Sequence, residues 1–418
     1  MTGKALEGLR IIEFCDEIGS YGGKLLADLG AEVIKVEPVG GGLQRKTPPF
    51  YRDSGNPDTS IAFWVHNTSK KSVTLDLDSE VGQRLARALV LTADAVLEDY
   101  PPGYLKARGL GYEALSALKP SLVYTSMTGF GQTGPHAGYA YIDMVGQAMG
   151  GIMTLAGDPD DPPHTIYGNQ ANISASLNGA IGTLLGVLHA EATGEGQSVD
   201  VSAQDAVSMS METAMMTWDM QKRNRTRTGA RGMIPVSIPA FGVYKATDGY
   251  CILYVTAPAG ADFPALVDWM REKGMEGDLD EEPYRTISSE LNMRFLTQVM
   301  ADPSSVERIA PQLEHMNDLV EAFCATLSAR ELYEEGQRRL LLVGICSTPK
   351  DLAENTQLRA REWYQALAME FLDTTLEFPG PPYRLSESPA VISRPPRLGE
   401  HNGEVLAGLG AGQQGGVR

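Results

Sequence analysis

The sequence predicts an α/β protein whose large domain is built on a doubly wound parallel sheet. Short apolar runs bounded by Gly and Pro recur along the first half of the chain, and helical segments separate them. This alternation is typical of parallel strands joined by crossover helices. Further along, a hairpin pattern followed by helical segments indicates a second domain. A chain of 418 residues is long enough to bury more than one core.

The first predicted unit is a strand, a helix and a strand. Residues 9–14 form a buried strand, residues 24–30 the helix, and residues 32–37 a strand that ends at Pro38. A unit of this length implies a parallel pair with a crossover helix. Four further strands are predicted at residues 72–77, 95–98, 122–126 and 198–201, and helices at 80–92, 112–119 and 174–192.

The second half begins with a basic, polar run at residues 221–232, which we interpret as a linker with a solvated surface. Residues 241–255 contain two strand patterns joined at Thr247-Asp248-Gly249, which predicts a hairpin. Residues 262–340 have mainly helical patterns. A helix is expected from Pro349 to Trp363, and the end of the chain from Pro379 onward is Pro-rich and is expected to be extended.

Charge and composition exclude several classes of function. The net charge of -18 argues against nucleic acid or an anionic membrane as the main partner. The four Cys and six His residues lack the spacing of a disulfide framework or a metal site. The N-terminus does not resemble a signal peptide, and no run of about 18 apolar residues predicts a membrane span. We therefore expect a cytoplasmic protein without a bound metal.

The glycines after the first strand do not favour a nicotinamide enzyme. Gly19, Gly22 and Gly23 miss the G-x-G-x-x-G spacing, and the chain contains no Walker sequence. These glycines also have a purely conformational interpretation, because they permit positive φ and close backbone approach.

An amide-rich loop precedes the small-residue helix predicted at residues 174–192. Its sequence, residues 166–172, is Ile-Tyr-Gly-Asn-Gln-Ala-Asn. A helix N-terminus is a favourable place for an exposed anionic nucleophile. However, no Asp or Glu lies between Asp161 and Glu191. The loop therefore offers amides where a carboxylate would be expected.

Four separated blocks together resemble the family III coenzyme A transferases, which include formyl-CoA transferase and carnitine CoA-transferase. The blocks are residues 23–38, residues 67–77, residues 128–135 with 143–150, and residues 357–361 with 395–401. The resemblance implies a Rossmann-like large domain and a smaller domain, in subunits that interlock as ring-like dimers. It places residues 1–220 and 346–418 in the large domain and its return linker, and residues 233–345 in the small one.

The resemblance also implies a covalent mechanism. An Asp attacks an acyl-CoA thioester to form a mixed anhydride, and CoA returns to give an aspartyl thioester. The family Asp falls on Asn172, with Asn169 as second choice, and neither amide can act as this nucleophile. An alignment slip would instead assign the role to Asp158, Asp160 or Asp161. A racemase branch uses a His where this chain has Ile142, so we do not expect racemisation.

The CoA contacts implied by the resemblance are spread over several turns. We expect no permanently bound cofactor, with coenzyme A or acyl-CoA as substrate. Glu17 in the first turn would repel phosphates, whereas three nearby cations could bind them or could be plain surface charges. The predicted contacts are Glu17, Ile18, Lys70, Lys71, Leu75, Asp76, Asp99, Tyr100, Pro101, Arg108, Ala140 and Ile142. The glycine-rich substrate loop of the small domain is reduced to Pro258-Ala259-Gly260-Ala261.

A chain that keeps the family scaffold but lacks the nucleophile suggests that two different subunits share the catalytic roles. We hypothesise that a homologous, Asp-bearing sister subunit completes a heterodimer or heterotetramer with this chain. The resemblance implies succinyl-CoA as donor and an acid such as (R)-benzylsuccinate, of anaerobic toluene degradation, as acceptor. Two alternatives stay open: a homodimeric transferase or acyl-CoA isomerase that uses another carboxylate, and a non-catalytic acyl-CoA-binding protein.

Overall fold

A computed structural model describes residues 3–231, 237–255, 261–300, 302–407 and 409. The chain divides into two compact units. The larger unit contains residues 1–152, 165–219 and 356–418, and the smaller one contains residues 153–164 and 220–355. Pro258, Ala259 and Gly260 of the predicted substrate loop fall outside the described residues.

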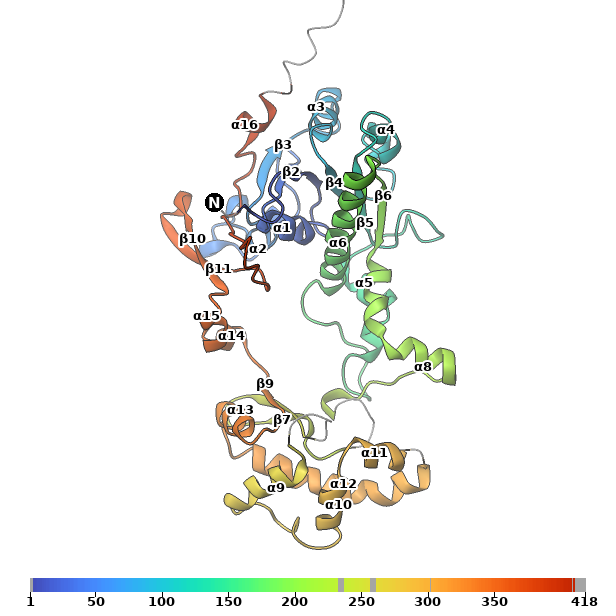
Figure 1. Ribbon diagram of the computed structural model, residues 1–418, viewed down its shortest axis with the longest axis vertical. Coiled ribbons are helices and arrows are strands. Elements are labelled where there is room, and N and C mark those ends of the chain that lie inside the picture. The colour runs from blue at the N-terminus through green and yellow to red at the C-terminus, as the bar shows by residue number, and fades with distance from the viewer. Residues whose placement is uncertain (1–2, 232–236, 256–260, 301, 408, 410–418) are drawn as a thin grey trace, which may run out of the picture. The chain divides into compact units, whose positions relative to one another are not determined.

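A six-stranded, all-parallel sheet forms the centre of the larger unit (Figure 1). Its strand order is β3-β2-β1-β4-β5-β6, the doubly wound order in which the winding reverses between β1 and β4. All six predicted strands are confirmed. Their bounds are β1 Arg10–Phe14, β2 Glu32–Glu37, β3 Lys71–Thr74, β4 Ala95–Glu98, β5 Val123–Thr128 and β6 Ser198–Ser202.

Helices cover both faces of this sheet, and each face has its own apolar core. On one face, α1 (Ser20–Asp28) and α6 (Gln170–Thr193) pack over residues such as Ile11, Leu97 and Met127. On the other face, the core contains Ile12, Val36 and Leu89. The helices there are α3 (Glu80–Val90), α4 (Tyr112–Ser116) and α16 (Asn402–Leu406). Two buried faces explain why the strands read as nearly continuous apolar runs.

Close approach of α1 and α6 depends on Gly22 and the Ser176 hydroxyl. The Gly22 N–H donates to Ser176 Oγ (3.0 Å), and a Cβ at position 22 would lie 2.6 Å from the Ser176 carbonyl oxygen. Helix α6 is long and apolar enough by composition to cross a membrane. Its fully buried Ser176 and Thr183 instead bond to the rest of the unit, with Thr183 Oγ1 2.7 Å from Thr125 Oγ1, so this face of α6 packs against the sheet.

The C-terminal segment returns to the open edge of the sheet at β3. The Ser72 N–H donates to His401 Nδ1 (3.2 Å), and the Thr74 N–H donates to Asn402 Oδ1 (2.8 Å). The His401 N–H donates to the Ser72 carbonyl (3.0 Å). Covering an edge strand in this way satisfies its backbone groups and protects it from pairing with another chain.

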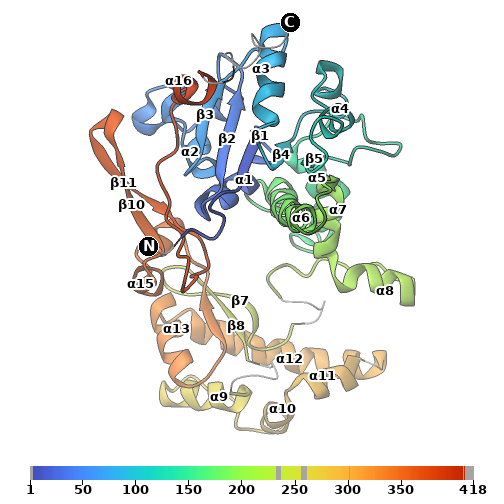
Figure 2. The same cartoon turned by 45° about the horizontal axis from the view of Figure 1, so that its top comes forward.

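The shorter elements of the larger unit surround the sheet. They are α2 (Ile61–His66), α5 (Asp143–Met149), α7 (Ala203–Ser208), α15 (Thr356–Ala360), β10 (Tyr364–Met369) and β11 (Thr374–Pro379). Helix α8 (Thr213–Gln221) runs across the boundary between the two units. β10 and β11 pair as an antiparallel ribbon, labelled together in Figure 2.

The smaller unit is an α+β domain. Its sheet has the antiparallel order β7-β8-β9, and the predicted hairpin at residues 241–255 is confirmed. The bounds of the strands are β7 Phe241–Lys245, β8 Tyr250–Tyr254 and β9 Val343–Ile345. The helices are α9 Phe263–Glu272, α10 Tyr284–Glu290, α11 Met293–Met300, α12 Pro303–Cys324, α13 Ala329–Arg338 and α14 Pro349–Ala353.

Three features of the structure differ from the sequence predictions. The helix expected from Pro349 to Trp363 is two short helices, and residues 364–379, for which no element was predicted, form the β10–β11 ribbon. Alternating exposure along β10 is the pattern of a strand, and Trp363 O accepts from the Gly380 N–H (2.7 Å), which closes the ribbon. Helix α6 begins at Gln170 rather than residue 174, so Asn172 lies in its first turn.

Candidate active-site groove

Three adjoining cavities form a groove at the carboxyl ends of the parallel strands. They have volumes of about 580, 340 and 330 Å³, and Tyr100 lines all three. The largest lies between the turn after β1 and the turn after β4. This is the point where the strand order reverses, and ligands of doubly wound sheets bind there.

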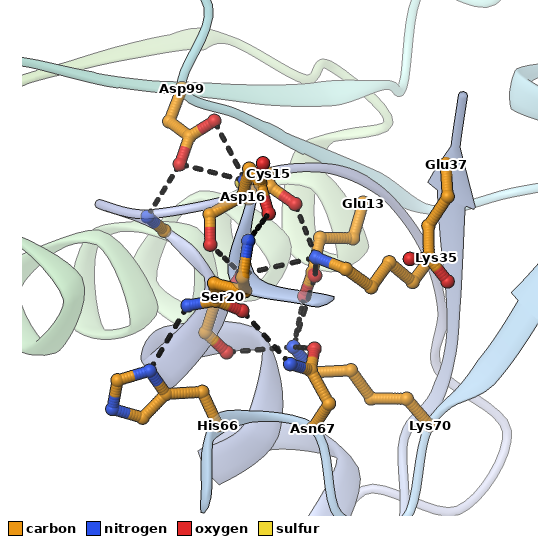
Figure 3. A network of polar contacts seen from close by, with 12 residues as sticks. Glu13, Cys15, Asp16, Ser20, Lys35, Glu37, His66, Asn67, Lys70 and Asp99 are labelled. Atoms are coloured by element: carbon orange, nitrogen blue, oxygen red, sulfur yellow. Dashed lines mark hydrogen bonds and ion pairs between the residues drawn. The ribbon is translucent and has the colours of Figure 1, made fainter. Parts of the chain in front are cut away.

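The turn after β1 is held by a carboxylate from the neighbouring strand. Asp99, directly after β4, accepts four backbone N–H bonds of 2.8–3.1 Å on Oδ2, from Asp16, Glu17, Ile18 and Gly19 (Figure 3). Such a run of N–H groups is an anion-binding concavity. Burial raises the pKa of Asp99 to about 6, while the Gly19 N–H opposes this shift. The protein therefore fills its own anion site with Asp99.

Glu98 is a second buried carboxylate beside this turn. It is 6% exposed and accepts the Tyr100 N–H at 3.0 Å. Burial raises the pKa of Glu98 to about 7, whereas a hydrogen bond from Ser126 lowers it and the charge of Asp99 raises it further. Among the described residues, no lysine or arginine forms an ion pair with Glu98.

Replacing Glu98 by Gln is expected to stabilise the protein above neutral pH. Folding raises the pKa of the Glu98 carboxyl from 4.5 to about 7. The folded protein therefore becomes less stable, relative to the unfolded chain, as the pH rises between those two values. The amide lacks this loss and keeps an oxygen acceptor for the Tyr100 N–H. We expect a gain of about 1–3 kcal/mol at about pH 8 and no difference below the unfolded pKa. Urea unfolding curves across this range measure it, and a destabilised variant at alkaline pH would contradict it.

Asn172 is fixed in place as an amide in the first turn of α6. It is 5% exposed, and its Oδ1 accepts the Tyr141 hydroxyl at 2.9 Å. Its backbone N–H donates to Asp143 Oδ1 (2.9 Å), and Gln147 Nε2 donates to Asp143 Oδ2 (2.7 Å). Because Tyr141 lines the 580 Å³ cavity, Asn172 is located directly behind the cavity wall. The amide is neutral, so it cannot attack a thioester.

The other candidates for the nucleophile position are less well placed. Asn169 is exposed at the start of α6, and its side chain makes no capping hydrogen bond. Asp158, Asp160 and Asp161 belong to the smaller unit. There, Arg227 of the basic run donates to the carbonyls of Asp158 (3.1 Å) and Asp161 (2.7 Å). The acidic loop is thus tied to the linker segment through its backbone.

The far end of the groove is an aromatic pocket with one cation at its border. Leu75 and Asp76 line this 330 Å³ cavity with Tyr100 and Tyr104, whose rings stack at 4.3 Å. The Arg108 guanidinium lies 3.6 Å from the centre of the Tyr104 ring and 2.5 Å from Asp78 Oδ1. A flat ligand such as a purine would fit against stacked rings of this kind.

Lys70 and Lys71, predicted as phosphate contacts, do not reach the groove. Both lie at the amino end of β3, whereas the groove lies at the carboxyl ends. Lys70 is 4% exposed and donates to Glu13 and Asn67 inside the unit, as Figure 3 shows. Lys71 pairs with Glu32 (2.8 Å) and Glu404 (2.5 Å). Both belong to the matched block at residues 67–77, but they lie at the start of β3, at the edge of the sheet opposite the groove.

Most other predicted contacts surround the largest cavity, and their binding to CoA stays a prediction. Its lining includes Glu17, Ile18, Asp99, Tyr100, Pro101 and Ala140. Ile142 does not line this cavity: it is 59% exposed at the N-cap of α5.

Two polar residues of the groove, Lys46 and Thr128, were not among the predicted site residues. Lys46 is an exposed cation lining the 340 Å³ cavity, and the described residues supply it with no ion pair. The sequence feature that could have indicated Lys46 is the Arg45-Lys46 pair, which follows the glycine run after the second predicted strand. Thr128 lines the largest cavity at the end of β5, and its buried hydroxyl has no protein partner within the described ranges. A hydroxyl ending a buried strand was the available signal.

The chain is similar to CoA-transferases over nearly its whole length. The family model "CoA-transferase family III" matches residues 6–402. Succinyl-CoA:(R)-benzylsuccinate CoA-transferase subunit BbsE of Thauera aromatica is 32% identical over 410 residues, covering 98% of this chain and 95% of that protein. Succinate--glutarate CoA-transferase of Agrobacterium fabrum is 31% identical, covering 97% and 95%.

Solved structures agree with this similarity. A CaiB/BaiF family protein from Brucella suis superposes with a TM-score of 0.82 at 28% identity, covering 97% of this chain and 100% of that one. The matched blocks, the doubly wound sheet and the groove at its switch point therefore have one common explanation. The chain belongs to CoA-transferase family III.

Proposed function

We propose that this chain is the subunit without a nucleophile in a heteromeric, cytoplasmic CoA-transferase. A homologous sister subunit supplies the Asp, in a heterodimer or heterotetramer that interlocks as the family resemblance implies. The donor is succinyl-CoA and the acceptor is a carboxylic acid such as (R)-benzylsuccinate. The similar BbsE protein is named as a subunit of a transferase for these two compounds, which supports both the assembly and the substrates.

The geometry of Asn172 carries this proposal. The family resemblance assigns the nucleophile position to Asn172, whose amide oxygen accepts a hydrogen bond from the Tyr141 hydroxyl at 2.9 Å. Its backbone N–H is bonded to Asp143, so the first turn of α6 is ordered without a carboxylate at position 172. The chain thus keeps the surroundings of the nucleophile but lacks its charge. Covalent acyl transfer requires an ionised carboxylate, which the sister subunit would provide.

The groove supports binding of CoA itself by this chain. The stacked Tyr100 and Tyr104 offer a surface for adenine, and Lys46 and Arg108 are cations for phosphates in or beside the same groove. The 580 Å³ cavity continues from Tyr100 toward Tyr141 and would take the pantetheine arm. This chain would then hold a CoA thioester even though it does not attack it.

The test compares CoA exchange between succinyl-CoA and (R)-benzylsuccinate by this chain alone and by a co-expressed mixture with an Asp-bearing paralogue. We expect turnover only in the mixture, and its loss when the paralogue's Asp is replaced by Asn. Turnover by this chain alone would overturn the proposal and favour a homodimeric enzyme that uses another carboxylate. Ligand binding without a stable sister complex would favour a non-catalytic acyl-CoA-binding protein.

A further inference from the structure

Helix α6 carries apolar side chains on its outer face as well as on the face that packs against the sheet. Ser176 and Thr183 are fully buried on the inner face. On the outer face, four large aliphatic side chains are 41–62% exposed: Leu177, Ile181, Leu185 and Leu188. Their spacing of four, four and three residues places them along one line of the helix. We call this line the α6 stripe.

A helix with apolar side chains on every side is normally buried on every side. Helix α6 has the composition of such a helix, yet less than half of its most apolar window is covered within this chain. The neighbouring helices α1 and α7 pack against α6 (Figure 2), and neither covers the stripe. Large aliphatic side chains that are exposed in a continuous line mark an interaction surface.

Further exposed apolar side chains lie on the elements next to α6. Met144 and Met149 of α5 are 54% and 47% exposed, and Met209, directly after α7, is 73% exposed. Helices α5 and α7 both pack on α6. Methionine side chains are flexible and adapt to an opposing surface. Together with the stripe they present an exposed area on the order of 700 Å², close to the ~800 Å² that each partner contributes to a stable interface.

The distribution of charge identifies the kind of partner. Charged residues make up 21% of the chain, but no Asp, Glu, Lys or Arg lies between Asp161 and Glu191. With a net charge of -18, two copies of this chain repel each other over most of their surfaces. A charge-free stripe is a surface on which a second acidic copy can approach. The same stripe gives a partner recognised by its charge, such as a basic peptide, nothing to pair with.

A membrane is a poorer partner for the stripe than a second copy. Helices that lie on membranes carry Lys and Arg on their polar face, which bind the lipid headgroups. No Lys or Arg lies between Lys119 and Lys222, a range that contains the whole of α6. The side chains that end and follow this helix are acidic, at Glu191 and Glu195. The surroundings of the stripe therefore repel an anionic membrane.

We propose that two copies of this chain associate through the α6 stripe, with the two helices antiparallel across a two-fold axis. A two-fold contact brings the same surface of each copy together. Leu177 then faces Leu188 of the second copy, and Ile181 faces Leu185 of the second copy, so each aliphatic side chain meets another. The contact goes beyond the proposed function, which requires only a sister subunit. Combined with that function, on which this step rests, it selects the heterotetramer over the heterodimer.

The first test measures the mass of the full chain alone by analytical ultracentrifugation over a series of concentrations. We expect a dimer. Leu185→Glu places two unpaired carboxylates in each interface, so the dissociation constant of the dimer should rise at least about a hundredfold. Leu118→Glu adds the same charge at a side chain that is 59% exposed just after α4, outside the stripe, and should leave the dimer unchanged. Circular dichroism checks that both variants are folded.

Disulfide crosslinking tests the antiparallel register without relying on a destabilised dimer. The background variant is Cys346→Ser, because the other three cysteines are buried. Two co-expressed forms of the chain, one with Leu177→Cys and one with Leu188→Cys, should crosslink to each other under mild oxidation. Leu177→Cys alone should not crosslink, because the rise of the helix separates its two copies by about 16 Å. A crosslink in Leu177→Cys alone would contradict the antiparallel contact.

Several results would overturn the inference. They are a chain that stays monomeric throughout the series, a dimer that survives Leu185→Glu, and a crosslink from the stripe to the sister subunit in place of a second copy. A monomer that binds phosphatidylcholine vesicles and loses this binding in Leu185→Glu would assign the stripe to a membrane instead.

The outcome separates this inference from the proposed function. Turnover in the mixed-subunit assay decides whether a sister subunit supplies the nucleophile, whatever the stripe binds. If the stripe forms the dimer but no mixture shows turnover, the inference stands and the heteromeric transferase does not. If the mixture turns over while the stripe variants change neither mass nor crosslinking, the transferase stands and the inference does not.

Discussion

Replacing Glu13 by Gln is expected to lower the free energy of unfolding by about 3–5 kcal/mol, the loss usual when one partner of a buried ion pair is removed. Glu13 is fully buried between two ammonium groups, with Lys35 Nζ 3.0 Å from Oε1 and Lys70 Nζ 2.8 Å from Oε2. Burial already lowers the pKa of Lys70 to about 8 despite this carboxylate. The amide has the same shape but leaves two buried cations without a counter-charge. Urea unfolding at neutral pH measures the loss.

The control for this variant is Glu32→Gln. Glu32 also pairs with two cations, Arg10 (2.6 Å) and Lys71 (2.8 Å), but its side chain is 34% exposed. Solvent screens such pairs, so we expect a loss below about 1 kcal/mol. Similar losses in the two variants would show that burial does not determine the strength of the Glu13 pair.

Replacing Asp99 by Ala is expected to remove the restraint on the turn after β1. The carboxylate accepts the backbone N–H groups of Asp16, Glu17, Ile18 and Gly19. Ala offers no acceptor, so these groups lose their partner at the wall of the largest cavity. We expect a loss of about 3 kcal/mol in unfolding free energy and about tenfold weaker binding of CoA, since charged acceptors contribute about 1.5–3 kcal/mol per bond at most and water replaces part of them.

Two variants define the cause of that loss. Asp99→Asn keeps one oxygen acceptor without the charge. It should lose about half as much unfolding free energy as Asp99→Ala. Asp78→Ala removes a carboxylate that is 74% exposed in its ion pair with Arg108, and its stability loss should stay below about 1 kcal/mol. An Asp99→Ala variant as stable as the unaltered chain would mean that the turn holds its shape without the carboxylate.

The four inner strands of the sheet, β2, β1, β4 and β5, could be predicted from sequence because they are buried on both faces. The apolar runs at Ile11-Ile12 and Val33-Ile34 have no competing helical pattern, and Gly or Pro bounds them. The β10–β11 ribbon was missed because its residues alternate in exposure and include Glu377 and Thr374, which also suit a loop. Short two-stranded ribbons depend on their tertiary surroundings for stability.

The positions of site residues that directly follow a strand could be predicted from the sequence. The positions of residues that precede a strand could not. Tyr100, Pro101 and Leu75 follow the carboxyl ends of their strands, and the structure places all three along the groove. Lys70 precedes its strand and turns inward to Glu13, a pairing over 57 positions that no local pattern contains. The hydrogen bonds between Asp99 and the turn after β1 likewise join residues about 80 positions apart in the chain.

The return of the C-terminal segment to β3 has a consequence for the order of events on the ribosome. The edge of the sheet is completed only by His401 and Asn402, yet its first strands are made before residue 75. Both segments of the smaller unit, residues 153–164 and 220–355, are synthesised between these two parts. The nascent larger unit therefore waits with an unpaired strand edge while more than 300 further residues emerge. At about 5–20 residues per second that interval is long enough for chaperones to bind the open edge.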